Sequence, residues 1–222
     1  MAFAHVKKVA IIGGGVAGLN TARALSARGL QCTIFEKEAD VGGVWRSNYS
    51  GYGVQVPRNL YEFLDFPFST VKEWDFPTGA QVQAYIKAFK AKHVDGVATT
   101  RVGSGVTSLA PRTDGARGWS VSTATDKDLP FDYAVLCTGL YSTPFVPAIK
   151  AEGSAAQVVH STAFTSAEAA KGKHVVVLGG CKSALDCAVA AANAGAASTT
   201  LLSRKAHWGT PRKIAGVLPF QL

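Results

Sequence analysis

The sequence predicts a protein of the α/β class, made of two strand–helix–strand motifs with a β-meander between them. Three observations support this prediction. A short β-rich run over residues 8–12 leads into a glycine-rich turn, after which apolar residues recur at helical spacing. The same succession begins again at Lys173, 165 residues further along the chain. Between the two motifs, strand-like runs over residues 102–123 are broken by turn residues, as in a β-meander.

The first strand–helix–strand motif covers residues 8–36. Its helix is expected to end at Gly29, because glycine is often found just past a helix C-terminus. Residues 32–35 form the second strand, and Glu36 follows it directly. Two strands joined by one helix in this way are expected to run parallel.

A further helix is predicted after Thr78. Thr78 and Gln81 have the spacing of a capping box, in which each residue satisfies a backbone amide of the other. Apolar residues then recur at i, i+3, i+4 and i+7, namely Val82, Tyr85, Ile86 and Phe89. A buried strand over residues 133–137 follows the meander and ends at Thr138 and Gly139.

The second strand–helix–strand motif is predicted from a strand over residues 173–178, a helix over residues 183–194 and a strand over residues 199–203. It repeats the order of elements found in the first motif. The chain therefore carries one supersecondary pattern twice.

Composition excludes several classes of protein. With 47% hydrophobic and 17% charged residues, the 222-residue chain is not intrinsically disordered. Its apolar runs are far shorter than the roughly 18 residues that span a membrane, and the first glycine turn leaves no room for a signal peptide. The four cysteines lack CxxC or zinc-ligand spacing, which indicates core packing and a reducing compartment. We therefore expect a cytoplasmic protein without a membrane partner.

The positive charge is concentrated near the C-terminus. The formal net charge is +8, and from Lys171 onward seven basic residues face one acid, Asp186. A basic stretch can bind nucleic acid or a phosphate-rich small ligand, or form a solvated face. No nucleic-acid recognition module is visible in the sequence, and the basic residues follow a glycine motif, so a phosphate ligand is favoured over nucleic acid.

The first motif contains the spacing GxGxxG at Gly13, Gly15 and Gly18. In this pattern the first glycine makes the tight turn, the second lets a diphosphate approach the backbone, and the third permits close packing of helix on strand. The helix N-terminus offers amide donors and partial positive charge to the phosphates. Glu36, at the end of the next strand, would accept hydrogen bonds from a ribose diol and repel a 2′-phosphate. The first motif therefore predicts a Rossmann-type dinucleotide site.

The second motif predicts a different dinucleotide site. Its candidate cofactor-binding residues are Gly179, Cys181, Ser183, Ala184, Arg204 and Lys205. Cys181 stands where the second glycine is expected, so its side chain narrows the approach of a diphosphate. Arg204 and Lys205 follow the second strand and suit a 2′-phosphate, although Arg204 as a solvated surface charge stays an alternative. One acidic and one basic dinucleotide site together indicate a flavoprotein that uses FAD and NADPH.

Several ordered motifs resemble one known family along the whole chain. They are Gly42-Gly43-Val44-Trp45, Asp65-Phe66-Pro67-Phe68, Phe76-Pro77-Thr78-Gly79, Thr138-Gly139 with Tyr141, Pro144 and Pro147, His160-Ser161 with Phe164, and the second glycine turn. In this order they resemble the N-terminal portion of the flavin-containing monooxygenases, which are class B flavoprotein monooxygenases. The stretch with Arg204, His207, Trp208, Pro211 and Arg212 looks most similar to the plant and fungal branches.

The resemblance implies a mechanism. FAD would lie along the first glycine turn with Glu36 on its adenosine ribose, while Gly43, Val44 and Trp45 would lie near the isoalloxazine ring. Thr138 and Gly139 complete the candidate cofactor-binding set. NADPH would reduce FAD, and molecular oxygen would form a C4a-hydroperoxyflavin that oxygenates a soft nitrogen or sulfur nucleophile of a small-molecule substrate. The cofactor would supply the chemistry, and the protein would supply orientation and exclusion of water.

Gln55 is the candidate catalytic residue. Many members of the family have an asparagine two residues before a Pro-Lys pair, with its amide near the flavin. Here the pair is Pro57-Arg58, and the matching position is Gln55. The resemblance thus implies an amide on a longer arm.

The resemblance also predicts the domain organisation. Residues 1–150 would form a Rossmann-type FAD-binding domain with an inserted β-meander, incomplete without a C-terminal return of the chain. Residues 151–222 would form the first half of a second Rossmann-type domain, which binds NADPH. The chain would be a fragment, half of a split enzyme or a degenerate relative, and a complementing C-terminal polypeptide is a candidate partner. The alternatives are an NADPH oxidase that releases hydrogen peroxide and a non-catalytic nucleotide-binding module.

Overall fold

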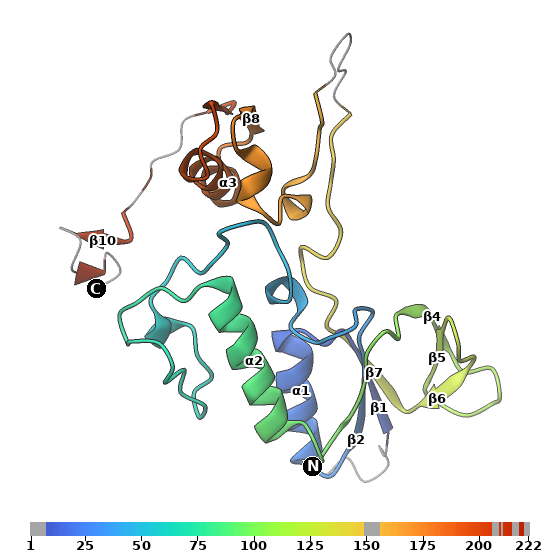
Figure 1. Cartoon of the computed structure of the whole chain (residues 1–222). Helices are drawn as coiled ribbons and strands as arrows, with labels where there is room; N and C mark the ends of the chain where they lie inside the picture. Colours follow the sequence, from blue (N-terminus) through green and yellow to red (C-terminus); the bar gives the residue numbers. More distant parts are fainter. Residues whose placement is uncertain (1–7, 149–155, 206–208, 210, 215–217, 220–222) are drawn as a thin grey trace. The chain divides into compact units, whose positions relative to one another are not determined.

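The computed structural model describes residues 8–148, 156–205, 209, 211–214 and 218–219 (Figure 1). The chain forms two compact units, which we call unit 1 (Met1–Arg46 and Gln83–Ser142) and unit 2 (Ser47–Val82 and Thr143–Leu222). The predicted domain boundary between residues 150 and 151 lies outside the described residues.

Unit 1 is built on a parallel sheet. Its strands are β1 (Lys8–Ile12), β2 (Gln31–Phe35), β3 (Thr99–Arg101) and β7 (Tyr133–Leu136), in the spatial order β3-β2-β1-β7. β1 pairs in parallel with both β2 and β7, and the helix that joins β1 to β2 is α1 (Val16–Ser26). The predicted first strand–helix–strand motif is confirmed.

The central strand β1 is covered on both faces. Ile11 faces α1, since a Cβ built on the helix residue Gly18 would lie 3.5 Å from Ile11 Cγ2. On the other face, Ala10 and Phe35 pack against Val121 and Phe131 of the meander in one buried cluster. Because both faces of the sheet are covered here, the sequences of β1 and of the end of β2 are continuously apolar.

The meander consists of β4 (Val106–Pro111), β5 (Trp119–Thr123) and β6 (Leu129–Phe131), paired antiparallel in sequence order. The predicted β-meander is therefore present, but it extends beyond the predicted residue 123 because the short run Leu129–Phe131 forms its third strand. The preceding β3 joins the parallel sheet instead.

The helix α2 (Gly79–His93) lies beside α1 (Figure 1). The Arg23 guanidinium of α1 lies over the Phe89 ring of α2, 5.6 Å from its centroid. The predicted capping box is formed: Thr78 N donates to Gln81 Oε1 at 2.9 Å, and Gln81 N donates to Thr78 Oγ1 at 3.3 Å. Its four apolar positions are buried, as the helical spacing indicated.

The capping box makes a measurable contribution to stability. We expect Thr78→Ala to lower the free energy of unfolding by about 1 kcal/mol, because one amide at the start of α2 loses its side-chain acceptor. Thr78→Ser keeps the hydroxyl and should lose much less. Urea denaturation followed by circular dichroism checks both variants, and an alanine variant as stable as the parent protein would contradict the expectation.

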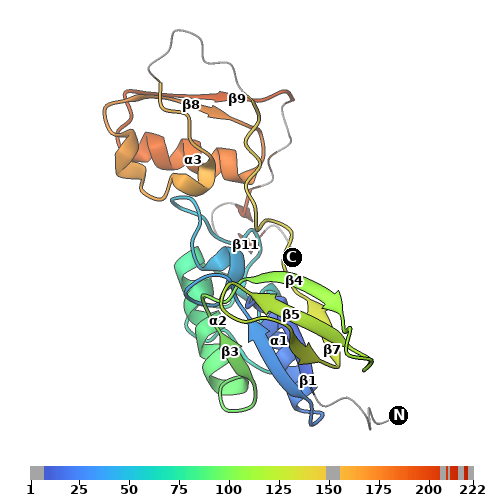
Figure 2. The same ribbon diagram turned by 90° about the vertical axis from the view of Figure 1, so that its right-hand side faces the viewer.

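Unit 2 contains the second predicted motif. β8 (His174–Leu178) and β9 (Ser198–Leu202) pair in parallel, and α3 (Lys182–Asn193) connects them. Figure 2 shows α3 along one face of this pair. The 3₁₀ turn η4 (Ala167–Ala170) also packs against α3, and a small antiparallel pair, β10 (Lys213–Ile214) and β11 (Leu218–Pro219), lies further along the chain.

The β8–β9 pair leaves apolar side chains in contact with solvent. Among the described residues, Val176 and Leu178 of β8 are 59% and 56% exposed, and Leu202 of β9 is 52% exposed. The alternating side chains Val175 and Val177 are more covered. Within the described part of the chain, one face of this pair is thus packed and the other is open.

The four cysteines are free thiols. Cys32 and Cys187 are buried and Cys137 is half-buried, as expected for core packing, but Cys181 is exposed. The exposure of Cys181 agrees with its predicted place in the second glycine turn rather than in the core. Of the helices in the described residues, none is long and apolar enough to cross a membrane.

Candidate dinucleotide-binding sites

The first glycine turn follows β1 at the carboxyl edge of the parallel sheet. Gly13 has a φ of +113°, and a Cβ built on it would lie 2.3 Å from the Cys137 carbonyl oxygen. A Cβ on Gly18 would lie 1.9 Å from the Gly13 carbonyl oxygen. These two glycines are therefore required by the backbone itself, because any side chain would overlap a carbonyl group.

Gly15 is different. It is the N-cap of α1 with an extended backbone, φ −78° and ψ −172°, which any residue can adopt. A Cβ built on Gly15 would have Gly43 Cα as its nearest neighbour, at an ordinary 3.7 Å. The fold does not need glycine here. What the missing side chain keeps free is the space in front of the first amides of α1, where a phosphate would bind.

Glu36 is a buried carboxylate beside this turn. The residue is 5% exposed; Oε2 accepts a hydrogen bond from Gly14 N at 2.7 Å, and Oε1 accepts one from Glu38 N at 2.9 Å. Each carboxylate oxygen can accept more than one hydrogen bond, so both retain capacity for ribose hydroxyl groups. Glu36 thus places a fixed negative charge next to the glycine turn.

Two further predicted segments lie against the turn. The 3₁₀ turn η1 (Gly43–Trp45) follows Gly42, whose amide donates to Gly14 O at 2.9 Å. On the other side, Cys137 N donates to Ile12 O at 2.8 Å, which places Thr138 and Gly139 next to Gly13. In η1, Val44 is exposed and Trp45 half-buried, and Thr138 and Gly139 are exposed. The structure therefore brings all predicted residues of unit 1 to one edge of the sheet.

Sequence reasoning missed Gln83 of α2. Its Nε2 donates to Val41 O at 2.8 Å, while its Oε1 is buried and has no hydrogen-bond partner among the described residues. A Cβ built on Gly42 would lie 2.0 Å from this oxygen, so the orphan acceptor lies beside the glycine turn. An unsatisfied buried acceptor at this place fits a cofactor that brings hydroxyl donors. No feature of its helical position could have singled it out.

Gln55 belongs to unit 2, a different unit from the residues described above. It is exposed, between the buried Val54 and Pro57. Its predicted role beside a flavin stays a prediction.

The second glycine turn repeats the backbone of the first. Gly179 has a φ of +140° and donates to Leu202 O at 2.9 Å, just as Gly13 donates to Phe35 O at 2.8 Å. Leu185 N donates to Cys181 O at 3.1 Å, matching Leu19 N to Gly15 O at 3.0 Å. The third glycine is replaced by the buried Ala184, whose Cβ would lie 3.1 Å from a Cβ on Gly179. The second turn therefore accommodates a Cβ at this position, whereas in the first turn a Cβ on Gly18 would overlap the Gly13 carbonyl group.

Cys181 occupies the N-cap of α3 with φ −99° and ψ −178°, the same extended conformation as Gly15. A cysteine in place of glycine at this N-cap therefore causes no backbone strain. Its side chain fills the space in front of α3 that corresponds to the space left free by Gly15 in front of α1. Ser183 is half-buried in the first turn of α3. Beyond β9, Arg204 and Lys205 are exposed, and neither forms an ion pair with another described residue. His207 and Trp208 lie outside the described residues.

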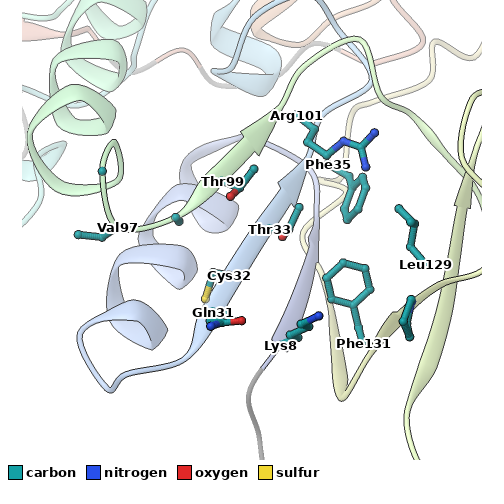
Figure 3. A pocket seen from close by; sticks show the side chains of 13 residues that line it. Lys8, Gln31, Cys32, Thr33, Phe35, Val97, Thr99, Arg101, Leu129 and Phe131 are labelled. Carbon is teal, nitrogen blue, oxygen red and sulfur yellow. The ribbon is translucent and has the colours of Figure 1, made fainter.

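A cavity of about 680 Å³ lies elsewhere in unit 1 (Figure 3). The Phe35 and Phe131 rings form part of its wall and pack edge to face, with their centroids 5.8 Å apart. Lys8, Gln31 and Thr99 line the other end of the cavity. Since these three residues begin their strands, this end of the cavity lies at the amino edge of the sheet. The cavity also reaches Phe35 and Arg101, the last residues of β2 and β3, but none of the glycines of the first turn lines it.

Comparison with known proteins identifies relatives for most of the chain. The family described as flavin-binding monooxygenase-like matches residues 6–222. "Probable flavin-containing monooxygenase 1" of Arabidopsis thaliana is 34% identical over 97% of this chain and 47% of its own length. Trimethylamine monooxygenase of Pelagibacter sp. (strain HTCC7211) is 31% identical over 88% of this chain and 50% of its own length.

Comparison with solved structures also finds an oxygenase as a structural neighbour. S-allyl-L-cysteine S-oxygenase from Allium sativum is similar with a TM-score of 0.77 and 27% identity, over 95% of this chain and 54% of that chain. The chain thus spans about half the length of the relatives it matches.

Proposed function

The chain belongs to the flavin-binding monooxygenase-like family, and from this premise we propose that its first glycine turn binds FAD and its second binds NADPH. The observation that carries the proposal is the repeated turn with opposite charges beside it. The first copy has the buried carboxylate of Glu36, and the second has the exposed cations of Arg204 and Lys205. A carboxylate suits a free ribose diol, whereas a cation suits the 2′-phosphate of NADPH.

In the proposed FAD site, the amides of the first turn of α1 bind the diphosphate, and Gly13 and Gly18 shape the turn. Glu36 accepts hydrogen bonds from the adenosine ribose while remaining bonded to Gly14 and Glu38. The other residues proposed to line FAD are Gly15, Gly43, Val44, Trp45, Thr138 and Gly139. Gln83 Oε1 would gain its missing donor from a cofactor hydroxyl group.

The proposed NADPH site uses the second turn in the same way. Gly179 makes the turn, Ala184 packs in place of the third glycine, and Cys181 and Ser183 lie at the start of α3. Arg204 and Lys205 bind the 2′-phosphate.

We further propose that the activity is oxygenation of a small molecule at a soft nitrogen or sulfur atom. Bound FAD would supply the redox chemistry, which is uptake of electrons from NADPH and activation of molecular oxygen. The protein would orient the substrate and exclude water, with the amide of Gln55 near the flavin. The names of two relatives, a trimethylamine monooxygenase and an S-allyl-L-cysteine S-oxygenase, support these two kinds of acceptor atom. We also propose a reducing compartment such as the cytoplasm, because the four cysteines have neither CxxC nor zinc-ligand spacing.

We also propose a complementing C-terminal polypeptide, from the same gene or a separate one. The open face of the β8–β9 pair supports this proposal, because Val176, Leu178 and Leu202 are the kind of side chains that a fuller nucleotide domain buries. The same observation favours a second candidate function for the isolated chain, namely NADPH oxidation that releases hydrogen peroxide.

The preference for NADPH is tested at Arg204. A charge-assisted contact contributes about 1.5–3 kcal/mol, so Arg204→Ala should raise the Kd of NADPH by roughly one to two powers of ten and leave that of NADH almost unchanged. Calorimetric titration with both nucleotides measures the effect. Lys173→Ala, which removes another exposed cation of unit 2, is the matched control. Equal losses for NADPH and NADH at Arg204→Ala would exclude a 2′-phosphate contact.

A further inference from the structure

Three titratable side chains of unit 2 meet next to the second glycine turn. Lys182, the first residue of α3, forms an ion pair through Nζ with Asp186 Oδ2, one helical turn further on. Tyr49 donates from its hydroxyl group to the same oxygen at 3.0 Å. Lys182 and Tyr49 lie 133 residues apart in the chain, so no local sequence pattern connects them.

Helix stability does not explain this arrangement. The positive end of the helix dipole is at the N-terminus, so a lysine in the first position of α3 is disfavoured there. A lysine four residues before an aspartate is also the less favourable order for an ion pair on a helix. A cation held at this point is instead suited to a negatively charged ligand in front of the helix.

Asp186 is the fixed partner of the pair and Lys182 the adaptable one. Tyr49 is 9% exposed, and its burial, together with the hydrogen bond to Asp186, raises the pKa of its hydroxyl group, so that it remains a donor to Asp186. The segment that carries Tyr49 is itself bonded within unit 2, since Ser50 N donates to Phe164 O at 2.7 Å. The lysine ammonium, in contrast, sits on a flexible four-carbon stem and can exchange one acceptor for another.

The two glycine turns differ at this position. The first position of α1 is Val16, whereas that of α3 is Lys182. The two helices differ likewise at the N-cap, where α1 has Gly15 and α3 has Cys181. A side chain at the N-cap keeps a diphosphate further from the backbone amides. A long cationic side chain one residue later can reach that diphosphate across the greater distance.

We infer that Lys182 binds the diphosphate of the nucleotide in the second turn, and that Asp186 and Tyr49 are positioning residues that hold its ammonium group while the turn is empty. The inference rests on the proposed nucleotide site. It adds a residue that acts on any dinucleotide, whereas Arg204 acts on the 2′-phosphate alone. It also means that Asp186 competes with the nucleotide for the lysine.

The first test compares Lys182→Gln with Lys182→Arg, using NADP⁺ and NAD⁺ as probes at low and high salt. Lys182→Gln should raise the Kd of both nucleotides by the same factor, roughly tenfold, and should make binding less dependent on salt. Lys182→Arg keeps the charge and should restore most of the affinity. Circular dichroism and thermal unfolding verify that the variants are folded.

The second test removes the competitor. Asp186→Asn can still accept the Tyr49 hydrogen bond but no longer holds a cation, so it should lower the Kd of both nucleotides, roughly threefold. In the Lys182→Gln background the same change should have no effect, since the competition is gone. A raised Kd for Asp186→Asn alone, or an equal change in both backgrounds, would overturn the competition.

The outcomes separate this inference from the proposed function. If neither nucleotide binds the parent protein, the proposed nucleotide site is wrong. If both bind and Arg204→Ala weakens only NADP⁺, the proposed site stands. In that case an unchanged Kd in Lys182→Gln, or a loss confined to NADP⁺, overturns the role of Lys182 at the diphosphate.

Discussion

A Gly13→Val protein is expected to be purified without flavin. The backbone at Gly13 has a φ of +113°, where a β-branched residue is strained by about 1–3 kcal/mol. The added Cβ would also lie 2.3 Å from the Cys137 carbonyl oxygen, closer than any real contact. The turn must then move, and with it the start of α1, where the FAD diphosphate is proposed to bind. The ratio of flavin absorbance to protein absorbance measures retention.

A matched variant separates loss of the fold from loss of the cofactor. Gly15→Ala introduces a Cβ in an extended backbone with its nearest neighbour at 3.7 Å, so the protein should fold as the parent does. It should nevertheless bind FAD more weakly, because the methyl group fills the space left for the diphosphate. Circular dichroism and a flavin titration check these two expectations. If Gly13→Val is as yellow as the parent protein, the FAD assignment is wrong.

The second large expected effect concerns how much of the NADPH consumed leads to oxygenated product. The 222-residue chain alone should oxidise NADPH slowly and release mostly hydrogen peroxide rather than oxygenated substrate. The physical reason is that efficient oxygenation requires a site that excludes water, and unit 2, which would bind NADPH, has one strand-pair face open to solvent in its described part. The measurement is the amount of product and of peroxide formed per NADPH consumed.

Addition of a polypeptide that corresponds to the C-terminal half of the relatives should restore product formation. A C-terminal polypeptide from an unrelated Rossmann-type protein is the control, because it should not cover the β8–β9 face in the same way. Rapid oxygenation by the chain alone, with little peroxide, would contradict both the expectation and the proposed complementing polypeptide.

Much of the fold is predictable because its signals are local. The capping box of α2 depends on two residues three positions apart, and the two strand–helix–strand motifs on apolar patterns and glycine turns within about 30 consecutive residues each; all are present in the structure. The third meander strand and β3 are three residues each, too short for a period of their own. Their existence depends on pairing with β5 and β2, which no local pattern reveals.

The candidate sites show the same division. The glycine spacings and Glu36 are visible in the sequence because a turn between strand and helix needs them in a fixed order. Gln83 is recognisable only after folding places its Oε1 beside Gly42. The contact of Tyr49 with Asp186 joins residues 137 positions apart, so sequence spacing contains no trace of it. The roles of the individual residues toward FAD and NADPH stay predictions until the variants are measured.

A comparison of the two glycine turns shows which of their positions carry the same residue. Within one chain, the position with a strongly positive φ is glycine in both copies, Gly13 and Gly179. The extended N-cap position is Gly15 in one turn and Cys181 in the other, and the helical position is Gly18 in one and Ala184 in the other. The two turns therefore agree where φ is strongly positive and differ at the positions that face the ligand or the helix packing. A strand–helix turn of one architecture can in this way present different chemistry to a ligand.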